Sequence, residues 1–170
     1  MLPKELKKTF LEQKDSFTDI LGQNKVKQQI KSALLTNRHI IIVGPPGIGK
    51  TTLAKNIAKL LPQGLKNFVR VQGSPDLTAE DLLGDIDPIK ALKYGPLSLE
   101  AFQKGKIFKA DKGILFFDEL NRCPEKLQNA LLQVLEEGKA TIGSYDVDFN
   151  IDFIFIGTMN PEDSSTEVLS

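Results

Sequence analysis

Glycines, a lysine and two threonines stand close together in the segment Gly44–Thr52. The letters GPPGIGKT fit G-x-x-x-x-G-K-[ST], the phosphate-binding P-loop. Glycines let the backbone curl until several N–H groups point at one anion, and a following helix adds its positive N-terminal end. Lys50 would add a charge for the β- and γ-phosphates, while the Thr51 hydroxyl could bind Mg²⁺. The expected nucleoside-triphosphate site consists of Gly44, Pro45, Pro46, Gly47, Ile48, Gly49, Lys50, Thr51 and Thr52.

Two acids follow the apolar run Ile114–Phe117, which is typical of a buried strand. In an open α/β sheet, ligands bind at the carboxyl ends of the strands, where Asp118 and Glu119 would lie. Asp118 could hold Mg²⁺, usually through water, and Glu119 could polarise the water that attacks the γ-phosphate. Alone, such a pair would be solvated acids at a strand end, but the upstream P-loop favours the catalytic interpretation.

Asn160 follows another apolar run, Phe153–Gly157, and so should reach the same edge of the sheet. It is either a turn residue or a hydrogen-bond donor to the attacking water or the γ-phosphate. Near the start of the chain, Ile20 and Leu21 either pack against the core or form an apolar shelf for an adenine ring.

Apolar patterns predict the elements that must position these residues. The predicted strands are 39–43, 67–72, 114–117 and 153–157, and the predicted helices begin near residues 24, 50, 78 and 125. Pro62 is expected to mark the end of the helix that follows the P-loop. Alternating residues in Tyr145–Ile151 predict a half-buried antiparallel strand, paired with Lys139–Ile142 through a turn at residues 143–144. The uneven segment 84–112 is interpreted as a functional insertion with one helix near Leu97–Phe102.

The composition fits an ordinary domain with a sizeable core and excludes several classes of protein. The 170 residues carry 22 basic and 22 acidic side chains, which is not the signature of a general nucleic-acid binder. The single cysteine, Cys123, excludes an internal disulfide and suits a reducing compartment. We expect a cytoplasmic protein with no membrane partner. His39 is interpreted as a strand-entry residue and Cys123 as structural.

The order of these segments resembles the AAA+ ATPases and is most similar to their MoxR-type and magnesium-chelatase ATPase-subunit group. The resemblance runs from about Phe17 to Glu162 and is carried by GPPGIGKTT, FVRVQGSPDLTAEDLLG, GILFFDELNRCPEKLQNALLQVLEEG and GTMNP. The P-loop and the Asp-Glu pair indicate a P-loop ATPase in general. Arg70-Val-Gln with Pro-Asp76, and Asp118–Arg122 with Leu127–Leu132, point more specifically to MoxR.

The resemblance implies an α/β P-loop fold, a three-layer αβα sandwich with a parallel sheet. Residues 1–170 would be the large nucleotide-binding subdomain, with an N-terminal helix or arm at 1–16, a helix-2 insert at about 84–112 and a pre-sensor-1 hairpin at 139–151. ATP and Mg²⁺ would be the cofactors. By the resemblance, Lys50 and Thr51 belong to Walker A, Asp118 and Glu119 to Walker B, and Asn160 is sensor 1. The same likeness assigns adenine contacts to Ile20, Leu21 and Gly22.

The resemblance breaks off at the end of the chain. Related ATPases continue into a fifth strand with an arginine finger and then a helical lid with a sensor-2 arginine. This sequence ends at Ser170, and Arg122 stands at the wrong motif position for either arginine. We therefore expect a fragment or a short form that lacks the fifth strand and lid and leaves strand 39–43 as a sheet edge. Loss of the finger would slow ATP hydrolysis about a thousandfold or more, leaving binding with little turnover.

The leading functional hypothesis is a ring-forming ATPase, a hexamer in the full-length form, that remodels partner proteins. By the resemblance, its work would be chaperone-like maturation or metal-cofactor insertion, with a von Willebrand A-domain protein or a client protein as partner. One alternative is a helicase-type or DNA-remodelling motor, but residues 144–152 contain three aspartates and no Lys or Arg, so nucleic acid is not an expected partner. Another alternative is a nucleotide-gated binding module without turnover. A Lon-like protease has no support, because no Ser-Lys protease region is present.

Overall fold

A computed structural model of the chain describes residues 17, 22–60, 67–96, 98, 100–142, 145–148 and 150–161. Four features expected from the sequence lie outside these residues. They are the N-terminal arm at 1–16, the contacts of Ile20 and Leu21, the helix end at Pro62 and the turn at residues 143–144.

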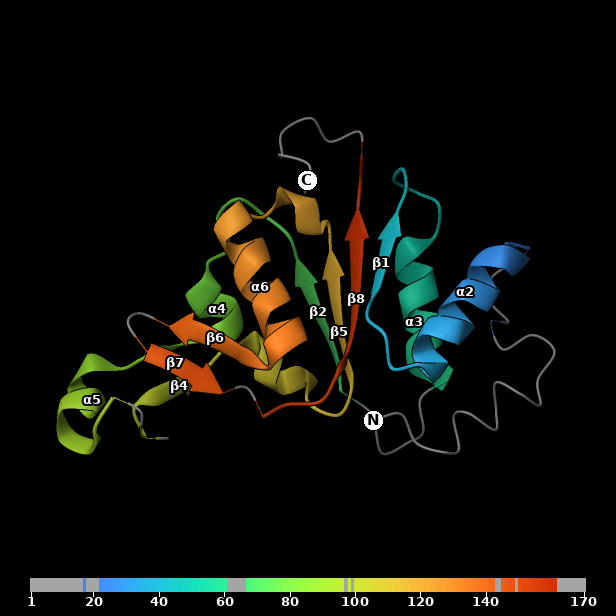
Figure 1. The fold of residues 1–170 in the computed structure, drawn as a ribbon. Coiled ribbons are helices and arrows are strands. Elements are labelled where there is room, and N and C mark those ends of the chain that lie inside the picture. The colour runs from blue at the N-terminus through green and yellow to red at the C-terminus, as the bar shows by residue number, and fades with distance from the viewer. Residues whose placement is uncertain are drawn as a thin grey trace.

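A parallel sheet forms the centre of the described part of the chain (Figure 1). Its strands are β1 (Ile40–Val43), β2 (Phe68–Gln72), β5 (Ile114–Asp118) and β8 (Ile154–Met159), in the order β1-β8-β5-β2. All three strand pairs are parallel. The predicted parallel sheet is therefore confirmed, and the four predicted strands agree with the observed ones to within one or two residues at each end.

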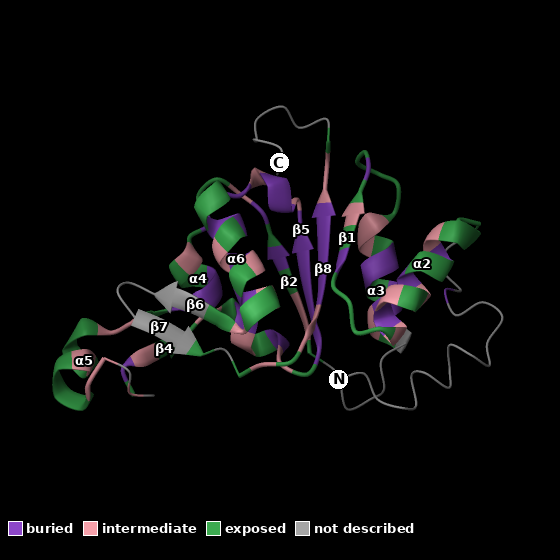
Figure 2. Cartoon of the chain, viewed as in Figure 1, coloured by how far each residue is buried: buried purple, intermediate pink, exposed green. Residues whose placement is uncertain are grey.

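Helices cover both faces of this sheet and give the predicted three layers (Figure 1). On one face lie α2 (Asn24–Leu35) and α3 (Lys50–Leu60), and on the other lie α4 (Ala79–Leu83), the 3₁₀ helix η1 (Lys106–Ala110) and α6 (Glu125–Glu137). Successive strand residues point to opposite faces, so each strand feeds both cores. In β5, Ile114 and Phe116 pack with the α2–α3 core, whereas Leu115 and Phe117 pack with the α6 core. Figure 2 shows β5 buried along its length.

The segment marked in the sequence as an insertion holds β3 (Gly84–Ile86), α5 (Pro88–Tyr94), β4 (Phe102–Lys104) and η1. The predicted helix near Leu97–Phe102 is wrong, because Phe102 begins β4, which pairs antiparallel with β3. The helix lies earlier, where Asp87 accepts hydrogen bonds from the N–H groups of Ile89 and Lys90 and Pro88 occupies the first turn. All residues of α5 are described and none is buried, so no apolar periodicity marked this helix in the sequence.

A hairpin follows α6, as predicted. β6 (Lys139–Ile142) pairs antiparallel with β7 (Tyr145–Asp148). β7 ends at Asp148, three residues before the predicted Ile151. The hairpin adjoins β3, so hairpin and insertion project together at the side of the molecule away from β1 (Figure 1). Within the described residues, no helix has both the length and the apolar character needed to cross a bilayer.

Candidate nucleotide site

The P-loop connects β1 to α3 and is shaped by its glycines. Gly47 and Gly49 have φ values of 81° and 86°, in the left-handed region that other residues rarely adopt. A Cβ atom added at either position would have no neighbour within 4 Å, so the loop borders open space. The N–H of Leu53 donates to the carbonyl of Gly49 at 2.9 Å, which starts the regular bonding of α3. The backbone alone therefore makes a curved, accessible surface at a helix N-terminus, which suits a phosphate group.

A cavity of about 370 Å³ lies between this loop and the start of α2. Its lining consists of Gln23, Val26, Ile42, Val43, Gly47, Ile48, Gly49, Lys50, Thr52 and Leu53. The apolar members suit a flat base, and the glycines and Lys50 suit phosphates. Val26, Ile42 and Leu53 were not predicted for this site, because their apolar spacing indicated core packing. Gly22 is described and exposed but is not among the lining residues.

Backbone carbonyls hold the Lys50 ammonium. Nζ donates to the carbonyls of Gly44, of Pro45 at 3.3 Å and of Met159 at 3.4 Å. Met159 is the last residue of β8, and it lies opposite Val43 of β1 in the sheet register. The lysine charge therefore sits between the P-loop and the carboxyl end of β8. To bind phosphate it must exchange these carbonyl contacts for phosphate oxygens.

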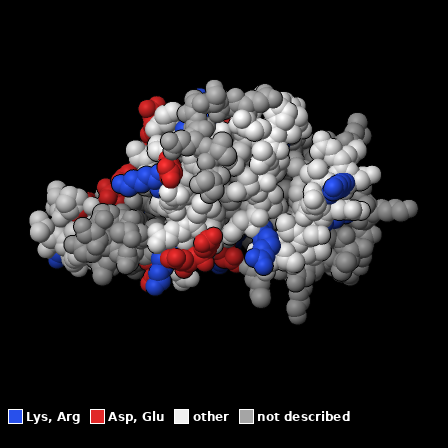
Figure 3. All heavy atoms as spheres, turned by 45° about the horizontal axis from the view of Figure 1, so that its top comes forward, with Lys and Arg blue, Asp and Glu red and all other residues white. Residues whose placement is uncertain are grey.

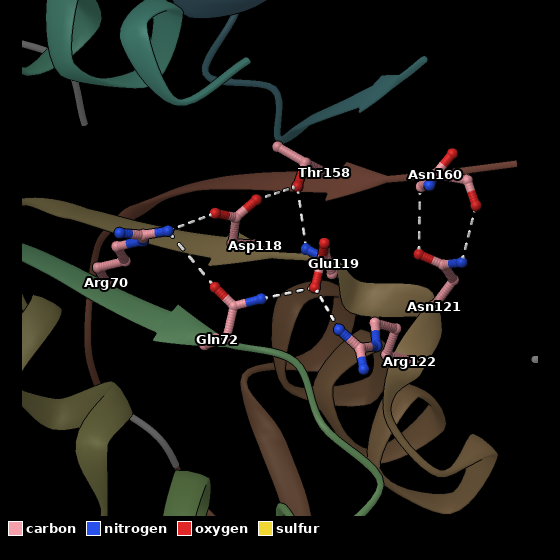
Figure 4. A network of polar contacts seen from close by, with 8 residues as sticks. All are labelled: Arg70, Gln72, Asp118, Glu119, Asn121, Arg122, Thr158 and Asn160. Carbon is pink, nitrogen blue, oxygen red and sulfur yellow. Dashed lines mark hydrogen bonds and ion pairs between the residues drawn. The ribbon is translucent and has the colours of Figure 1, made fainter. Parts of the chain in front are cut away.

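Asp118 is 9% exposed, and both of its carboxylate oxygens have partners (Figure 4). Oδ1 accepts a hydrogen bond of 2.7 Å from the Thr158 hydroxyl. Oδ2 forms an ion pair of 2.7 Å with the Arg70 guanidinium. The Thr158 hydroxyl also accepts from the N–H of Glu119 at 3.0 Å. Thr158 is fully buried, so it fixes the two acids relative to β8. We call Asp118, Glu119 and Thr158 the acidic edge.

Glu119 turns away from the strand that carries it. Its φ and ψ are 55° and 50°, where β5 passes into the 3₁₀ helix η2 (Leu120–Arg122). Oε2 accepts from the Gln72 amide at 2.7 Å and from the Arg122 guanidinium at 2.9 Å (Figure 4). Glu119 is therefore held by one donor from β2 and one from η2.

Arg70, Gln72 and Arg122 also belong to this site, and none of them was predicted there from the sequence. Arg70 and Gln72 are two residues apart in β2, so the sequence pattern could place them on one face of the strand. The register that sets Gln72 opposite Asp118 comes from the fold, so the sequence could not show that this face meets the two acids.

Asn160 lies at the same edge and is held by its backbone. The side chain of buried Asn121 accepts from the Asn160 N–H at 3.3 Å and donates to the Asn160 carbonyl at 3.0 Å (Figure 4). Asn121 was also missed, although it lies in the DELNR segment. Its role is to fix where the chain leaves β8.

β8 brings the predicted groups together. It lies between β1 and β5, and its consecutive residues Thr158 and Met159 contact Asp118 and Lys50 respectively. Lys50, Asp118, Glu119 and Asn160 therefore share one end of the sheet, although their segments are far apart in sequence.

The donor set of this edge suits Mg²⁺ bound together with a triphosphate. Thr51 offers a hydroxyl and Asp118 a carboxylate, both oxygen ligands of the kind that Mg²⁺ prefers. Among the described residues, no group of three or more His, Cys, Asp or Glu could hold a metal by itself. A metal here would need phosphate oxygens and water for its other ligands, which is the usual way Mg²⁺ is bound in nucleotide sites.

His39 and Cys123 lie outside this chemistry. Burial lowers the pKa of His39, whose Nδ1 accepts a hydrogen bond of 3.2 Å from the N–H of Phe155. Burial raises the pKa of the Cys123 thiol, which keeps it protonated and unreactive. Their positions agree with the structural roles expected from the sequence.

The family model and the similar proteins found by comparison point to one group of ATPases. A family model described as AAA domain (dynein-related subfamily) matches residues 39–170. Chaperone MoxR1 of Mycobacterium tuberculosis is 29% identical over 142 residues, which cover 84% of this chain and 35% of the relative. Magnesium-chelatase subunit ChlI of Olisthodiscus luteus is 29% identical over 172 residues, covering 86% of this chain and 51% of that protein. The chain thus spans about half or less of these curated relatives.

Solved structures agree on the fold. A crystal structure of a Cytophaga hutchinsonii protein superposes with a TM-score of 0.66 at 29% identity, covering 98% of this chain and 48% of the other. A complex of subunits BchI and BchD of magnesium chelatase gives a TM-score of 0.63 at 22% identity and covers 89% of this chain and 56% of that one. The second likeness concerns the fold alone.

Proposed function

Because the chain belongs to the AAA domain family (dynein-related subfamily), in the group of MoxR and magnesium-chelatase ATPases, we propose that it binds Mg-ATP and hydrolyses it. The observation that carries this proposal is the meeting of Lys50 and Asp118 at the end of β8. Lys50 lies 3.4 Å from the Met159 carbonyl, and Asp118 lies 2.7 Å from the Thr158 hydroxyl. A cation and an acid on either side of one strand end are placed to hold a triphosphate and its metal.

Each residue has a defined task in the proposed reaction. The P-loop N–H groups and Lys50 bind the phosphates and hold the γ-phosphate in one orientation. Thr51 and Asp118 would hold Mg²⁺, which when bound neutralises charge on the phosphate oxygens. Glu119 orients the attacking water and takes up its proton. Gln72 and Arg122 both bind Oε2, so the water would bind Oε1 or would replace one of these two donors.

Calorimetry and phosphate release test this proposal. We expect ATP binding in the presence of Mg²⁺ and slow release of phosphate, because Lys50 and Glu119 both start from internal contacts. Glu119→Gln should retain binding and reduce release about a hundredfold. The matched control Glu136→Gln removes an exposed carboxylate of α6 and should change neither. Release at ordinary motor rates that is unaffected by Glu119→Gln would overturn the assignment.

We further propose that the ATPase cycle remodels a client protein, with the chain working in a homo-oligomeric ring. The relative MoxR1 of Mycobacterium tuberculosis is named as a chaperone. On α5, which projects beside the β6–β7 hairpin, Ile89, Leu92 and Tyr94 are 78%, 92% and 50% exposed. Exposed apolar side chains on a projecting helix suit contact with a protein client better than contact with a phosphate backbone.

The surface charge favours this proposal over a nucleic-acid motor. On the face seen in Figure 3, acidic and basic side chains are interspersed rather than gathered by sign. On the hairpin, Lys139 pairs with Asp148 at 3.5 Å. Titration with single- and double-stranded DNA at low and moderate salt should therefore give no binding with the steep salt dependence of phosphate contacts.

A further inference from the structure

Arg70 occupies one oxygen of the carboxylate that would hold the metal. The Oδ2 atom of Asp118 lies 2.7 Å from Nη2 of Arg70, and Oδ1 is bound by the Thr158 hydroxyl. Both oxygens of Asp118 are therefore engaged in the structure (Figure 4). A metal ion or its water must therefore replace one of these two partners or share a carboxylate oxygen with it.

The two partners of Asp118 differ in how easily they can leave. Thr158 is fully buried, and its hydroxyl also accepts from the N–H of Glu119, so moving it would leave two polar groups without their partner. The Arg70 side chain is 50% exposed, on an edge strand of the described sheet. Arg70 Nη2 also lies 3.4 Å from Oε1 of Gln72, so a displaced guanidinium keeps an acceptor on its own strand. Arg70 is the replaceable partner.

Because both are positively charged, the Arg70 guanidinium and a divalent cation exclude one another at Asp118. A guanidinium and a divalent cation repel when they share one carboxylate, and the Asp118 side chain is only 12% exposed, so water screens this repulsion weakly. Without a metal, the same guanidinium neutralises a carboxylate that would otherwise be buried alone.

We propose that Arg70 is a built-in counter-ion that competes with Mg²⁺ for Asp118, so that metal binding requires its displacement. This inference rests on the proposed nucleotide site and concerns its regulation. It predicts that the chain with Arg70 needs a higher Mg²⁺ concentration to half-saturate its nucleotide site than the same chain without that charge.

A magnesium titration with a fluorescent N-methylanthraniloyl derivative of ATP tests the competition without measuring turnover. In Arg70→Gln, the half-saturating Mg²⁺ concentration should fall about two- to fivefold, the size expected for a partly exposed ion pair. Affinity for the nucleotide in EDTA should stay within twofold of the wild type. Arg70→Lys, which keeps the charge but loses the planar fork, should give a smaller shift and serves as a second, more conservative variant.

Arg122→Gln is the matched control, because it removes an equal charge from the neighbouring carboxylate Glu119. It should shift the magnesium midpoint less than twofold. Equal shifts in both variants would indicate a general electrostatic effect and overturn the competition. An unchanged or raised midpoint in Arg70→Gln, or a loss of affinity in EDTA, would overturn it as well, the last by showing that Arg70 contacts the nucleotide.

Asp118→Asn in the Arg70→Gln background gives an internal check. If the two cations compete for this carboxylate, removing its charge should abolish the effect of Arg70→Gln, and a persisting shift would contradict the proposal. Failure of the proposed function looks different. In that case the wild type itself gives no fluorescence change with the nucleotide, which overturns both proposals. A normal wild-type titration with an unshifted Arg70→Gln midpoint overturns only the competition between Arg70 and Mg²⁺.

Discussion

The P-loop and the acidic edge lie at the same end of the sheet but are built in opposite ways. The P-loop is made of backbone, and its residues 45–49 are exposed around open space. The acidic edge is made of side chains that already bind protein partners. The first region is ready to receive a ligand, apart from the carbonyl contacts of Lys50. In the second region, by our proposal, Arg70 must leave Asp118 before a metal can bind there.

Two glycines test this contrast most strongly. A Cβ atom at Gly73 would lie 2.1 Å from the Glu119 carbonyl oxygen, and the Gly73 N–H donates to the Asp118 carbonyl at 2.7 Å. Gly73→Ala should therefore force β2 from β5 and cost about 3 kcal/mol of unfolding free energy. Gly47→Ala meets open space and should cost about 1 kcal/mol, from backbone strain alone. Urea unfolding measures both free energies. Equal losses of unfolding free energy in the two variants would contradict the contrast between the two regions.

Lys50→Ala should weaken Mg-ATP binding about 10- to 100-fold, because it removes a charge-assisted contact to the phosphates. Lys55→Ala, on an exposed position of the same helix, is the matched control and should bind normally. Calorimetry gives both affinities. If the two variants lose affinity equally, the P-loop does not bind the phosphates as described.

Thr158→Val should destabilise the fold by about 1–2 kcal/mol, since it removes the hydroxyl that joins Asp118 Oδ1 to the Glu119 N–H and keeps nearly the same shape. Thr158→Ser keeps the hydroxyl and should recover most of that loss. Denaturant midpoints compare the two. A valine variant as stable as the wild type would mean that the acidic edge is not held by this side chain.

His39 gives the smallest expected effect and separates stability from nucleotide chemistry. Burial lowers its pKa in the folded chain, so the unfolded chain binds the proton more readily. Stability should therefore fall as the pH drops through about 6.5, the ordinary value for histidine, and be unaffected by this group at higher pH. His39→Gln should flatten that part of the stability curve, while Mg-ATP affinity stays the same. An unchanged slope would show that another group is responsible.

Most of the fold could be predicted because its signals are local. The runs 39–43 and 114–117 have the unbroken apolar character of buried strands, and the alternation at Tyr145–Ile151 marks the hairpin. The prediction failed at α5, whose surface position leaves no apolar face to detect. The cap formed by Asp87 and Pro88 was a usable signal there, but residues 84–112 were interpreted only as an uneven insertion with its helix near Leu97–Phe102.

By itself, the sequence determined the P-loop, because glycine spacing fixes backbone shape within eight consecutive residues. It also placed Asp118 and Glu119 at the end of a strand. The tertiary structure alone decided what these acids contact. Arg70 lies 48 residues before Asp118 and Thr158 lies 40 residues after it, and the strand order and register bring them together. Hydrogen bonds between side chains act over about 3 Å, so partners on separate strands become defined only when those strands pair.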